Sequence, residues 1–192
     1  MTDETLAAIL SAAESLFVRG NYADVSMRDI ARAAKVTTGA LYYHFPSKEK
    51  LYLAMLTAGL ARVGRLMAEA VPAQAACRQK LRSLTGVFLS LPPERRRLMR
   101  LVRRDINVFR GRGRRAIVQA YQQALPELVE AILREGLAAD ELRPQDPRWL
   151  AWVYIAIAET SLAPYAEARL GPLDARLDSL LDQFLVGAGR AA

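Results

Sequence analysis

The stretch "SMRDIARAAKVTTGALYYHFPSKEKLY", residues 26–52, decides the fold of the N-terminal part of this chain. Ser26 is followed three residues later by Asp29, a spacing that resembles a capping box at the start of a helix. This helix is expected to end near Ala34, because Thr37 is suited to cap the start of another one. Two short helices separated by about three residues form a helix-turn-helix arrangement.

The second of these helices has an apolar side and a polar side. Leu41 and Phe45 lie four residues apart and, with Val36, are expected to pack on the preceding helices. Two consecutive helix positions cannot both face inward, so the residues left facing outward are Thr38, Gly39, Tyr42 and Tyr43. A small residue near a helix start lets the backbone approach DNA, and hydroxyl groups can donate to phosphates and base edges.

The whole sequence predicts an all-α protein of about nine helices, because no long segment alternates with a period of two. Apolar residues from Leu6 to Phe17 recur at three and four positions, which predicts a first helix that ends at Gly20. The fourth helix is expected at about 48–70, the fifth starts at Pro72, and the sixth runs from "LPPE" (91–94) to about 107. A long seventh helix ends at about 138, with an interruption or kink near Pro126. The eighth starts at 146 and the ninth after 172. The segment "FRGRGRR", 109–115, is expected to be a loop because of its two glycines. We expect an N-terminal three-helix domain over residues 1–50 and a larger domain over 51–192, without a flexible linker.

Composition indicates a soluble globular protein, with 52% hydrophobic and 24% charged residues among 192. The longest apolar run, residues 149–158, is about half the length of a membrane-spanning helix, so no membrane partner is expected. The acidic start "MTDETLAA" is unlike a secretory signal, which leads us to expect a cytoplasmic protein. Cys77 is the single cysteine and His44 the single histidine. No metal cluster, phosphate-binding loop or nucleophile with an adjacent base is evident, so we expect a protein that is not an enzyme and needs no cofactor.

The formal net charge of +7 is unevenly distributed along the chain. Residues 1–50 hold six Lys or Arg and six Asp or Glu, whereas residues 78–115 hold thirteen basic residues against Glu94 and Asp105. The basic run from Arg95 to Arg115 has three interpretations: a solvated helix face, an additional attraction toward DNA, or the lining of a pocket for an anionic ligand.

The N-terminal stretch, including "AAESLFVRGNYADVSMRDIA", resembles the DNA-binding signature of the TetR family of bacterial transcriptional repressors over roughly the first 55 residues. The resemblance implies a homodimer that binds a palindromic operator and a C-terminal domain that binds a small-molecule inducer. It implies that Thr38, Gly39 and Tyr43 approach bases. It further implies phosphate contacts from Ser26, Arg28, Thr37, Tyr42, His44 and Lys48. The family usually has glycine in the turn where this chain has Lys35, and a left-handed turn there costs lysine about 1 kcal/mol. This departure suggests an altered turn or an added phosphate contact.

Candidate ligand-binding residues are aromatic, apolar or charged side chains of the larger domain: Phe88, Met99, Arg103, Phe109, Tyr121, Trp152 and Glu159. The same aromatic residues could equally form an ordinary core, and a buried hydrogen bond is an alternative role for Glu159. In the resembling family the sixth helix borders both the pocket and the DNA-binding domain. The arginines of that region therefore lead to an anionic amphiphile, such as an acyl-coenzyme A, as the ligand hypothesis.

Leucines recur at three and four residues in the last helix, together with Phe184, whereas Asp174, Asp178 and Asp182 recur between them. This stripe, from Leu170 to Leu185, predicts half of a two-fold dimer interface, a four-helix bundle formed with the helix that starts at 146. Packing inside one subunit is the alternative. A second functional hypothesis is a helical carrier of an anionic amphiphile that does not bind DNA.

Overall fold

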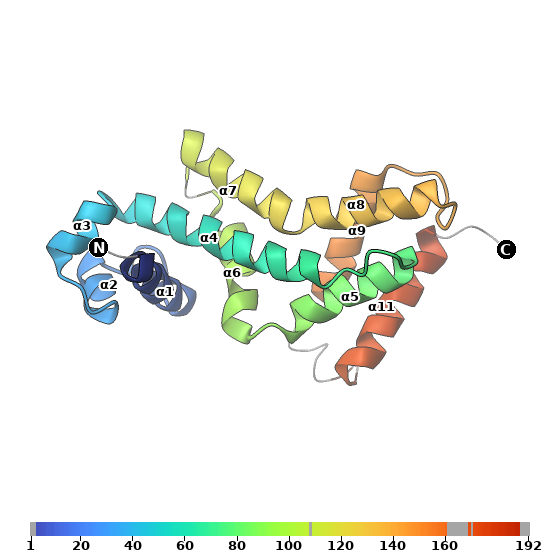
Figure 1. Cartoon of the computed structure of the whole chain (residues 1–192), viewed down its shortest axis with the longest axis horizontal. Helices are drawn as coiled ribbons and strands as arrows, with labels where there is room; N and C mark the ends of the chain where they lie inside the picture. Colours follow the sequence, from blue (N-terminus) through green and yellow to red (C-terminus); the bar gives the residue numbers. More distant parts are fainter. Residues whose placement is uncertain (1–2, 108, 161–168, 170, 189–192) are drawn as a thin grey trace. The chain divides into compact units, whose positions relative to one another are not determined.

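The computed structural model describes residues 3–107, 109–160, 169 and 171–188, with side chains for all of these except Asp3, Pro93, Glu94, Arg100, Arg103 and Ala188. All regular structure in these residues is helical, so the predicted all-α class is confirmed. The helices, labelled in Figure 1, are α1 (Asp3–Arg19), α2 (Met27–Ala33), α3 (Thr38–His44), α4 (Lys48–Glu69), α5 (Cys77–Ser90), α6 (Pro93–Asp105), α7 (Gly111–Ala124), α8 (Pro126–Ala138), α9 (Pro147–Thr160) and α11 (Leu173–Ala188).

The chain divides into two compact units. Unit 1 comprises residues 1–62 and 92–121, and unit 2 comprises residues 63–91 and 122–192. The first part of α4, all of α6 and most of α7 therefore group with the N-terminal helices. Two helices, α4 and α7, continue from one unit into the other, and the third crossing between the units lies between α5 and α6.

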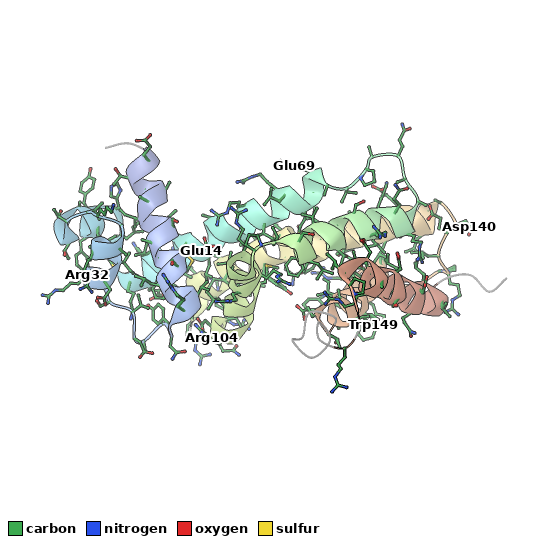
Figure 2. All side chains as sticks on the ribbon, turned by 90° about the horizontal axis from the view of Figure 1, so that it is seen from below. Glu14, Arg32, Glu69, Arg104, Asp140 and Trp149 are labelled. Carbon is green, nitrogen blue, oxygen red and sulfur yellow. The ribbon has the colours of Figure 1, made fainter. Side chains whose placement is uncertain are left out.

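In unit 1, the three N-terminal helices bury one apolar side each. Phe17 of α1, Ile30 of α2 and Leu41 of α3 are fully buried. A fully buried side chain of this size contributes about 1.5–3 kcal/mol relative to an exposed one, so these contacts hold the short α2 and α3 in place. An ion pair between Arg62 and Glu14, at 2.7 Å, joins α4 to α1, where Glu14 is labelled in Figure 2.

A cluster of four aromatic rings, together with hydrogen bonds to Asp105 at the end of α6, explains why α6 belongs to unit 1. The rings come from Phe17, Tyr22, Tyr52 and Phe109, with centroids 4.6–5.9 Å apart. Beside them, the Tyr52 hydroxyl donates to Asp105, which also accepts from Arg104 at 2.6 and 2.8 Å. Although burial favours the neutral acid, these hydrogen bonds hold the pKa of Asp105 below its ordinary value. The end of α6 is thus fixed to the start of α4.

In unit 2, α8 packs on α9, α5 packs on α8, and α11 packs on both α5 and α9. A Cβ built on Gly136 of α8 would lie 2.9 Å from the Cβ of Cys77, so only glycine allows α8 and α5 to approach this closely. Burial raises the pKa of the Cys77 thiol to about 12. Along the surface, the acidic residues of α11 pair with two arginines of α5, at 2.7 Å for Arg78 with Asp182 and 2.9 Å for Arg82 with Asp174.

The predicted start of the fifth helix at Pro72 is wrong, because α5 begins at Cys77. Ala76, at the N-cap position, has no side chain able to cap a helix. The backbone amide of Cys77 instead donates to the Glu141 carboxylate at 2.7 Å. The residue that satisfies this helix start is far away in the chain, so no local pattern indicates it.

The segment "FRGRGRR" was expected to be a loop, but α7 begins inside it at Gly111. Gly111 has φ +54°, a left-handed conformation that glycine adopts without steric cost. The predicted interruption near Pro126 is confirmed, because α7 ends at Ala124 and α8 begins at Pro126.

Helix α4 is the one helix in the described part of the chain that is long and apolar enough to cross a membrane. Half of its apolar window is buried inside the protein, and Leu56, Leu60 and Val63 have no exposed surface. A core helix of a soluble protein passes the same test, so this feature is weak evidence for a membrane span.

Candidate functional site

The start of α2 has the predicted capping box. The Asp29 amide donates to the Ser26 hydroxyl oxygen at 3.1 Å, and the Ser26 amide donates to the Asp29 carboxylate at 3.3 Å. Hydrogen bonds from the Ser26 side chain and backbone lower the pKa of Asp29. The hydroxyl of Ser26 also contacts the carboxylate at 2.5 Å, so it is engaged within the cap rather than free for a ligand.

The turn between α2 and α3 has a left-handed residue at the position that the family resemblance singled out. Lys35 has φ +57°, and its amide donates to the carbonyl of Arg32 at 3.2 Å. Val36 then donates to the carbonyl of Ala31 at 3.0 Å, which closes the turn. Lysine therefore occupies a conformation that glycine adopts more easily, and its side chain is exposed.

The start of α3 is capped by Thr37, whose hydroxyl oxygen accepts from the Ala40 amide at 3.1 Å. Leu41 and Phe45 are buried, as expected from their spacing. On the other side of the helix, Tyr42 is 48% exposed and Tyr43 is 82% exposed. Helix α3 thus presents two aromatic side chains with hydroxyl groups to solvent, as the sequence predicted.

Glycine at position 39 keeps the start of α3 open. Gly39 is exposed, and a Cβ built on it would meet only the Thr37 hydroxyl oxygen, at 3.9 Å, within 4 Å. Internal packing therefore does not require glycine here. The remaining predicted contact residues around this surface are half-buried (Thr38) or exposed (Ser26, Arg28 and Thr37). Together, these residues of α2 and α3 form one polar surface, called here the α3 surface.

His44 and Lys48, both predicted to bind phosphate, are held by the protein itself. The ring of His44 packs between those of Tyr43 and Phe45, and its Nε2 atom is buried without a hydrogen bond to any described residue. The Lys48 ammonium donates to the carbonyls of Tyr22, Ala23 and Val25, at 2.6, 3.2 and 2.9 Å.

These three bonds use all the donors of the Lys48 ammonium. It also lies 4.5 Å from the centroid of the Tyr22 ring, a cation–π contact. Lys48 therefore ties the start of α4 to the connector between α1 and α2, a role that sequence reasoning missed. A phosphate contact by Lys48 stays a prediction, and it requires the ammonium to leave these carbonyls.

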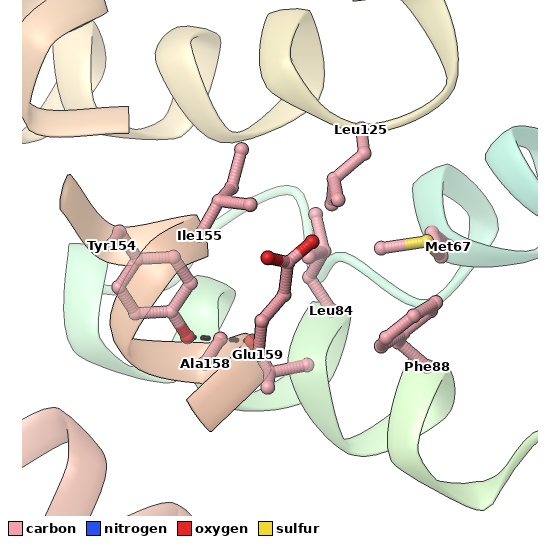
Figure 3. Close-up of a pocket in the computed structure, with 9 residues that line it drawn as sticks. Met67, Leu84, Phe88, Leu125, Tyr154, Ile155, Ala158 and Glu159 are labelled. Carbon is pink, nitrogen blue, oxygen red and sulfur yellow. Dashed lines mark hydrogen bonds between the residues drawn. The ribbon is translucent and has the colours of Figure 1, made fainter. Parts of the chain in front are cut away.

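Unit 2 contains a cavity of about 20 Å³, which is close to the space that one water molecule needs. Figure 3 shows the side chains around it, which come from α4, α5, the α7–α8 junction and α9. Its lining is largely apolar: Met67, Leu84, Thr85, Phe88, Leu125, Tyr154, Ile155, Ala158 and Glu159.

Three polar side chains lie in this wall. The hydroxyl oxygens of Thr85 and Tyr154 are 2.5 Å apart, and the Tyr154 hydroxyl donates to the Leu81 carbonyl at 3.4 Å. Burial raises the pKa of Tyr154, so its hydroxyl stays neutral and can donate. Glu159 places its carboxylate among the apolar residues in Figure 3. The cavity thus combines apolar walls with hydroxyl groups and one acid, a combination suited to a small organic ligand.

The predicted ligand residues are only partly brought together. Phe88 and Glu159 line the cavity, whereas Trp152 is 40% exposed on α9 and is absent from the lining. Met99, Phe109 and Tyr121 are buried and belong to unit 1. The side chain of Arg103 lies outside the described residues. Sequence reasoning missed the Thr85–Tyr154 pair as a site because the two residues are far apart in the chain.

The leucine stripe of α11 lies mostly inside unit 2. Leu177, Leu180, Leu181 and Phe184 are buried in the single chain, and Asp174, Asp178 and Asp182 pair with α5. The alternative of internal packing therefore holds for this part of the stripe, whereas Leu170 lies outside the described residues. The large apolar side chains that unit 2 exposes are Trp149 (66%), Trp152 (40%) and Val186 (84%).

Residues 9–55 match the family model described as bacterial regulatory proteins, tetR family. The matched segment contains α2, α3 and the turn between them. Among the described residues, no three His, Cys, Asp or Glu side chains cluster as a metal site requires.

The chain is 29% identical over 197 residues to the HTH-type transcriptional regulator TtgR of Pseudomonas putida, covering 94% of this chain and 91% of that protein. Its fold is similar to a transcriptional regulator FadR from Bacillus subtilis in complex with stearoyl-CoA, with a TM-score of 0.80, 19% identity and coverage of 95% and 98%. It is also similar to a regulator from Saccharomonospora viridis in complex with choline, with a TM-score of 0.80, 21% identity and coverage of 99% and 100%.

Proposed function

Because this chain belongs to the TetR family of bacterial transcriptional regulators, we propose that it is a repressor that binds a palindromic operator as a homodimer and leaves it when an inducer binds unit 2. Regulators of this family are typically cytoplasmic and are not enzymes. The observation that carries the proposal is the α3 surface, where two neighbouring tyrosines are exposed beside an exposed glycine.

The proposed DNA contacts follow from the two sides of α3. Because Leu41 and Phe45 hold the helix from inside, its polar side can enter the major groove as a rigid rod. Thr38, Gly39 and Tyr43 would then approach base edges. The phosphate contacts would come from Ser26, Arg28, Thr37, Tyr42, His44 and Lys48. The side chains of Ser26, His44 and Lys48 would first have to leave the internal contacts described above.

The proposed dimer uses α9 and α11. Trp149 and Trp152 lie three residues apart on α9, and Val186 is almost fully exposed on α11. Exposed aromatic residues of this size are enriched at protein interfaces, where burial of each ring contributes substantially to association. A two-fold axis would present two α3 surfaces to one face of a duplex, which is the arrangement that a palindromic site requires.

The cavity is the proposed inducer site, and an anionic amphiphile such as an acyl-coenzyme A is the proposed inducer. Apolar lining from Met67, Leu84 and Phe88 suits an acyl chain, and the Thr85 hydroxyl can donate to a thioester carbonyl while it accepts from Tyr154. The phosphates would remain outside, because Glu159 contributes an acid to the wall. At about 20 Å³ the cavity must expand to admit a chain.

Such expansion offers a way to release DNA. Met67 of the cavity wall lies on α4, and the same unbroken helix begins at Lys48, directly after α3. A displacement of the end of α4 by the inducer would therefore be transmitted along the helix to the end that supports α3.

Operator binding can be tested by selecting sites from a random-sequence DNA pool with the full-length protein. We expect a palindromic consensus, bound with salt-dependent affinity. Gly39→Gln should abolish selective binding without loss of folding, because the added side chain projects into open space on the α3 surface. Ala7→Gln, an equally exposed change on α1, is the matched control. Failure of the wild type to select any site would instead favour a carrier that does not bind DNA.

The inducer can be tested by adding acyl-coenzyme A of several chain lengths to the complex with the selected DNA. We expect release at one range of lengths and no release in Ala158→Leu, which fills the cavity. Ala131→Leu, an exposed change on α8 outside the cavity lining, should keep the response. Release by choline, with no response to any acyl-coenzyme A, would replace the anionic ligand with a cationic one.

A further inference from the structure

The positive charge of this protein belongs to unit 1. Unit 1 has 17 Lys or Arg and 8 Asp or Glu, a net charge of +9, whereas unit 2 has 10 and 12, a net charge of −2. Residues 1–50, which contain the α3 surface, are balanced at six and six. The surplus of unit 1 therefore comes from the segment around α6 and the start of α7, and the proposed DNA contacts described above do not use it.

Four arginines of this segment are available for a partner: Arg110, Arg112, Arg114 and Arg115. All four are exposed, and none forms an ion pair with a described residue. No acidic residue occurs between Asp105 and Glu127, and the acidic side chain that the fold brings close to this segment, Glu49 of α4, forms no ion pair with any of the four. By contrast, Arg104 of α6 is engaged by Asp105, and Arg97 lines a hollow with Val18 and Leu101. We call these four side chains the α7 arginine cluster.

The fold brings the α7 arginine cluster to the N-terminal turns of α4. A Cβ built on Gly113 would lie 3.1 Å from the Leu53 side chain and 3.4 Å from the Glu49 carboxylate. Leu53 lies in the second turn of α4, about 8 Å along the axis from Lys48. Because α4 starts directly after α3, the cluster lies beside the support of the recognition helix and within unit 1.

From this placement we propose that the α7 arginine cluster is a second phosphate-binding surface, which contacts the DNA backbone beside the half-site read by α3. The inference rests on the proposed function, because it assumes that α3 docks on a duplex. B-DNA carries about one negative charge per 1.7 Å of axis. Residues 1–50 have no net charge, so they gain little electrostatic attraction to the phosphates by themselves. Guanidinium groups remain charged and match phosphate geometry with two donors, so four exposed arginines supply what residues 1–50 lack.

An anionic small molecule fits this cluster less well. The arginines are exposed side chains at and directly before the start of α7, and none of them lines the cavity of unit 2. A ligand bound there would have no apolar walls to bury an acyl chain. An extended polyanion, such as a duplex, can contact several separate guanidinium groups at once and needs no enclosed pocket.

The experiment compares two double variants of the full-length protein. Arg112→Gln with Arg115→Gln removes two charges from the cluster, and Arg65→Gln with Arg134→Gln removes two exposed charges from unit 2, away from the proposed dimer helices. Binding to a random-sequence 40-base-pair duplex and to the selected operator is measured by fluorescence anisotropy across salt concentrations. The slope of log affinity against log salt is negative. For the first double variant, its magnitude should decrease by about 0.9 for each phosphate that the protein no longer neutralises, and by the same amount on both duplexes. The second double variant should keep the wild-type slope.

Three results would overturn the inference. The first is an unchanged slope in the Arg112 and Arg115 double variant. The second is an equal decrease of the slope in both double variants, which would show an effect of net charge without a local phosphate contact. The third is an Arg112 and Arg115 double variant that binds DNA as the wild type does but is no longer released by acyl-coenzyme A, which would assign the cluster to an anionic ligand. In each case the wild type still selects an operator, whereas failure of the proposed function is a wild type that selects none.

Discussion

Residues 26–52, called here the recognition segment, and the helices of unit 2 around the cavity, called here the cavity region, are held in place in different ways. In the recognition segment, the bonds at the helix starts join residues three positions apart: Asp29 with Ser26, Ala40 with Thr37 and Lys50 with Ser47. In the cavity region, the corresponding bonds join Thr85 with Tyr154 and Cys77 with Glu141, which are 69 and 64 residues apart. The surface proposed to read DNA is therefore specified locally, and the site proposed to bind the inducer is specified by distant packing.

This difference bears on how the two functions can change. A local cap needs only a few residues in order, so the recognition segment is readable as a motif. The cavity wall comes from four parts of the chain, so substitutions in α4, α5, the α7–α8 junction or α9 can alter its shape. Ligand choice can therefore diverge without a change in the α3 surface.

The largest effect should come from removing the inner side of the recognition helix. Leu41→Ala leaves a cavity under α3, because Leu41 is fully buried. We expect the free energy of unfolding to fall by about 2–5 kcal/mol, measured by urea denaturation of the full-length protein. A decrease below about 1 kcal/mol would mean that local caps alone hold α3.

Tyr43→Ala should separate function from stability on the same helix. The side chain is 82% exposed, so we expect the free energy of unfolding to change by less than about 0.5 kcal/mol. Operator binding should weaken by about 1–3 kcal/mol, the range of a good base contact, as measured by fluorescence anisotropy. Tyr43→Phe, which keeps the ring, is the conservative comparison. Unchanged affinity in Tyr43→Ala would remove this residue from the proposed interface.

Cys77 should make unit 2 sensitive to high pH. Its folded pKa is raised to about 12 by burial, above the ordinary value near 8.5, so folding keeps the thiol protonated. This contribution is complete below pH 8.5 and is lost as the pH rises toward 12, at a limiting slope of about 1.4 kcal/mol per pH unit. Urea denaturation between pH 8 and 11 should therefore show a steeper fall for the wild type than for Cys77→Ala. Parallel curves would contradict the burial of the thiol.

The smallest effect concerns the strained turn. Lys35→Gly should raise the free energy of unfolding by about 0.5–1 kcal/mol, because glycine adopts the observed φ of +57° without steric cost. Lys35→Ala removes the charge but keeps the Cβ, so it should give no such gain. Equal stabilisation by both variants would point to charge rather than backbone conformation.

Sequence reasoning predicted the recognition segment well because its signals are local. The caps at Ser26 and Thr37, the buried Leu41 and the exposed Tyr43 all follow from spacing within one or two turns. The departure from glycine at Lys35 suggested an altered turn or an added phosphate contact; the structure keeps the left-handed turn, and the phosphate contact stays a prediction. The predicted DNA contacts themselves remain predictions.

Sequence reasoning failed where the partner of a residue lies far away. The bonds from the Lys48 ammonium to carbonyls more than 20 residues earlier were not predicted, whereas its phosphate contact stays a prediction. The pattern of the α11 stripe leaves a dimer interface and packing inside one subunit open, and the structure shows the second for Leu177, Leu180, Leu181 and Phe184. An amphipathic pattern indicates that a helix face is covered, but not which surface covers it.

The amino-acid sequence by itself determined the helical class, the caps of α2 and α3, and which side of α3 faces solvent. These features depend on hydrogen bonds and side-chain directions within a few residues, where the chain has little freedom. Only the tertiary structure decided that Glu141 caps α5, that Thr85 meets Tyr154 in the cavity wall, and that the α7 arginine cluster lies beside α4. Such contacts require the closure of long loops, and their stability depends on how all the buried surfaces fit together.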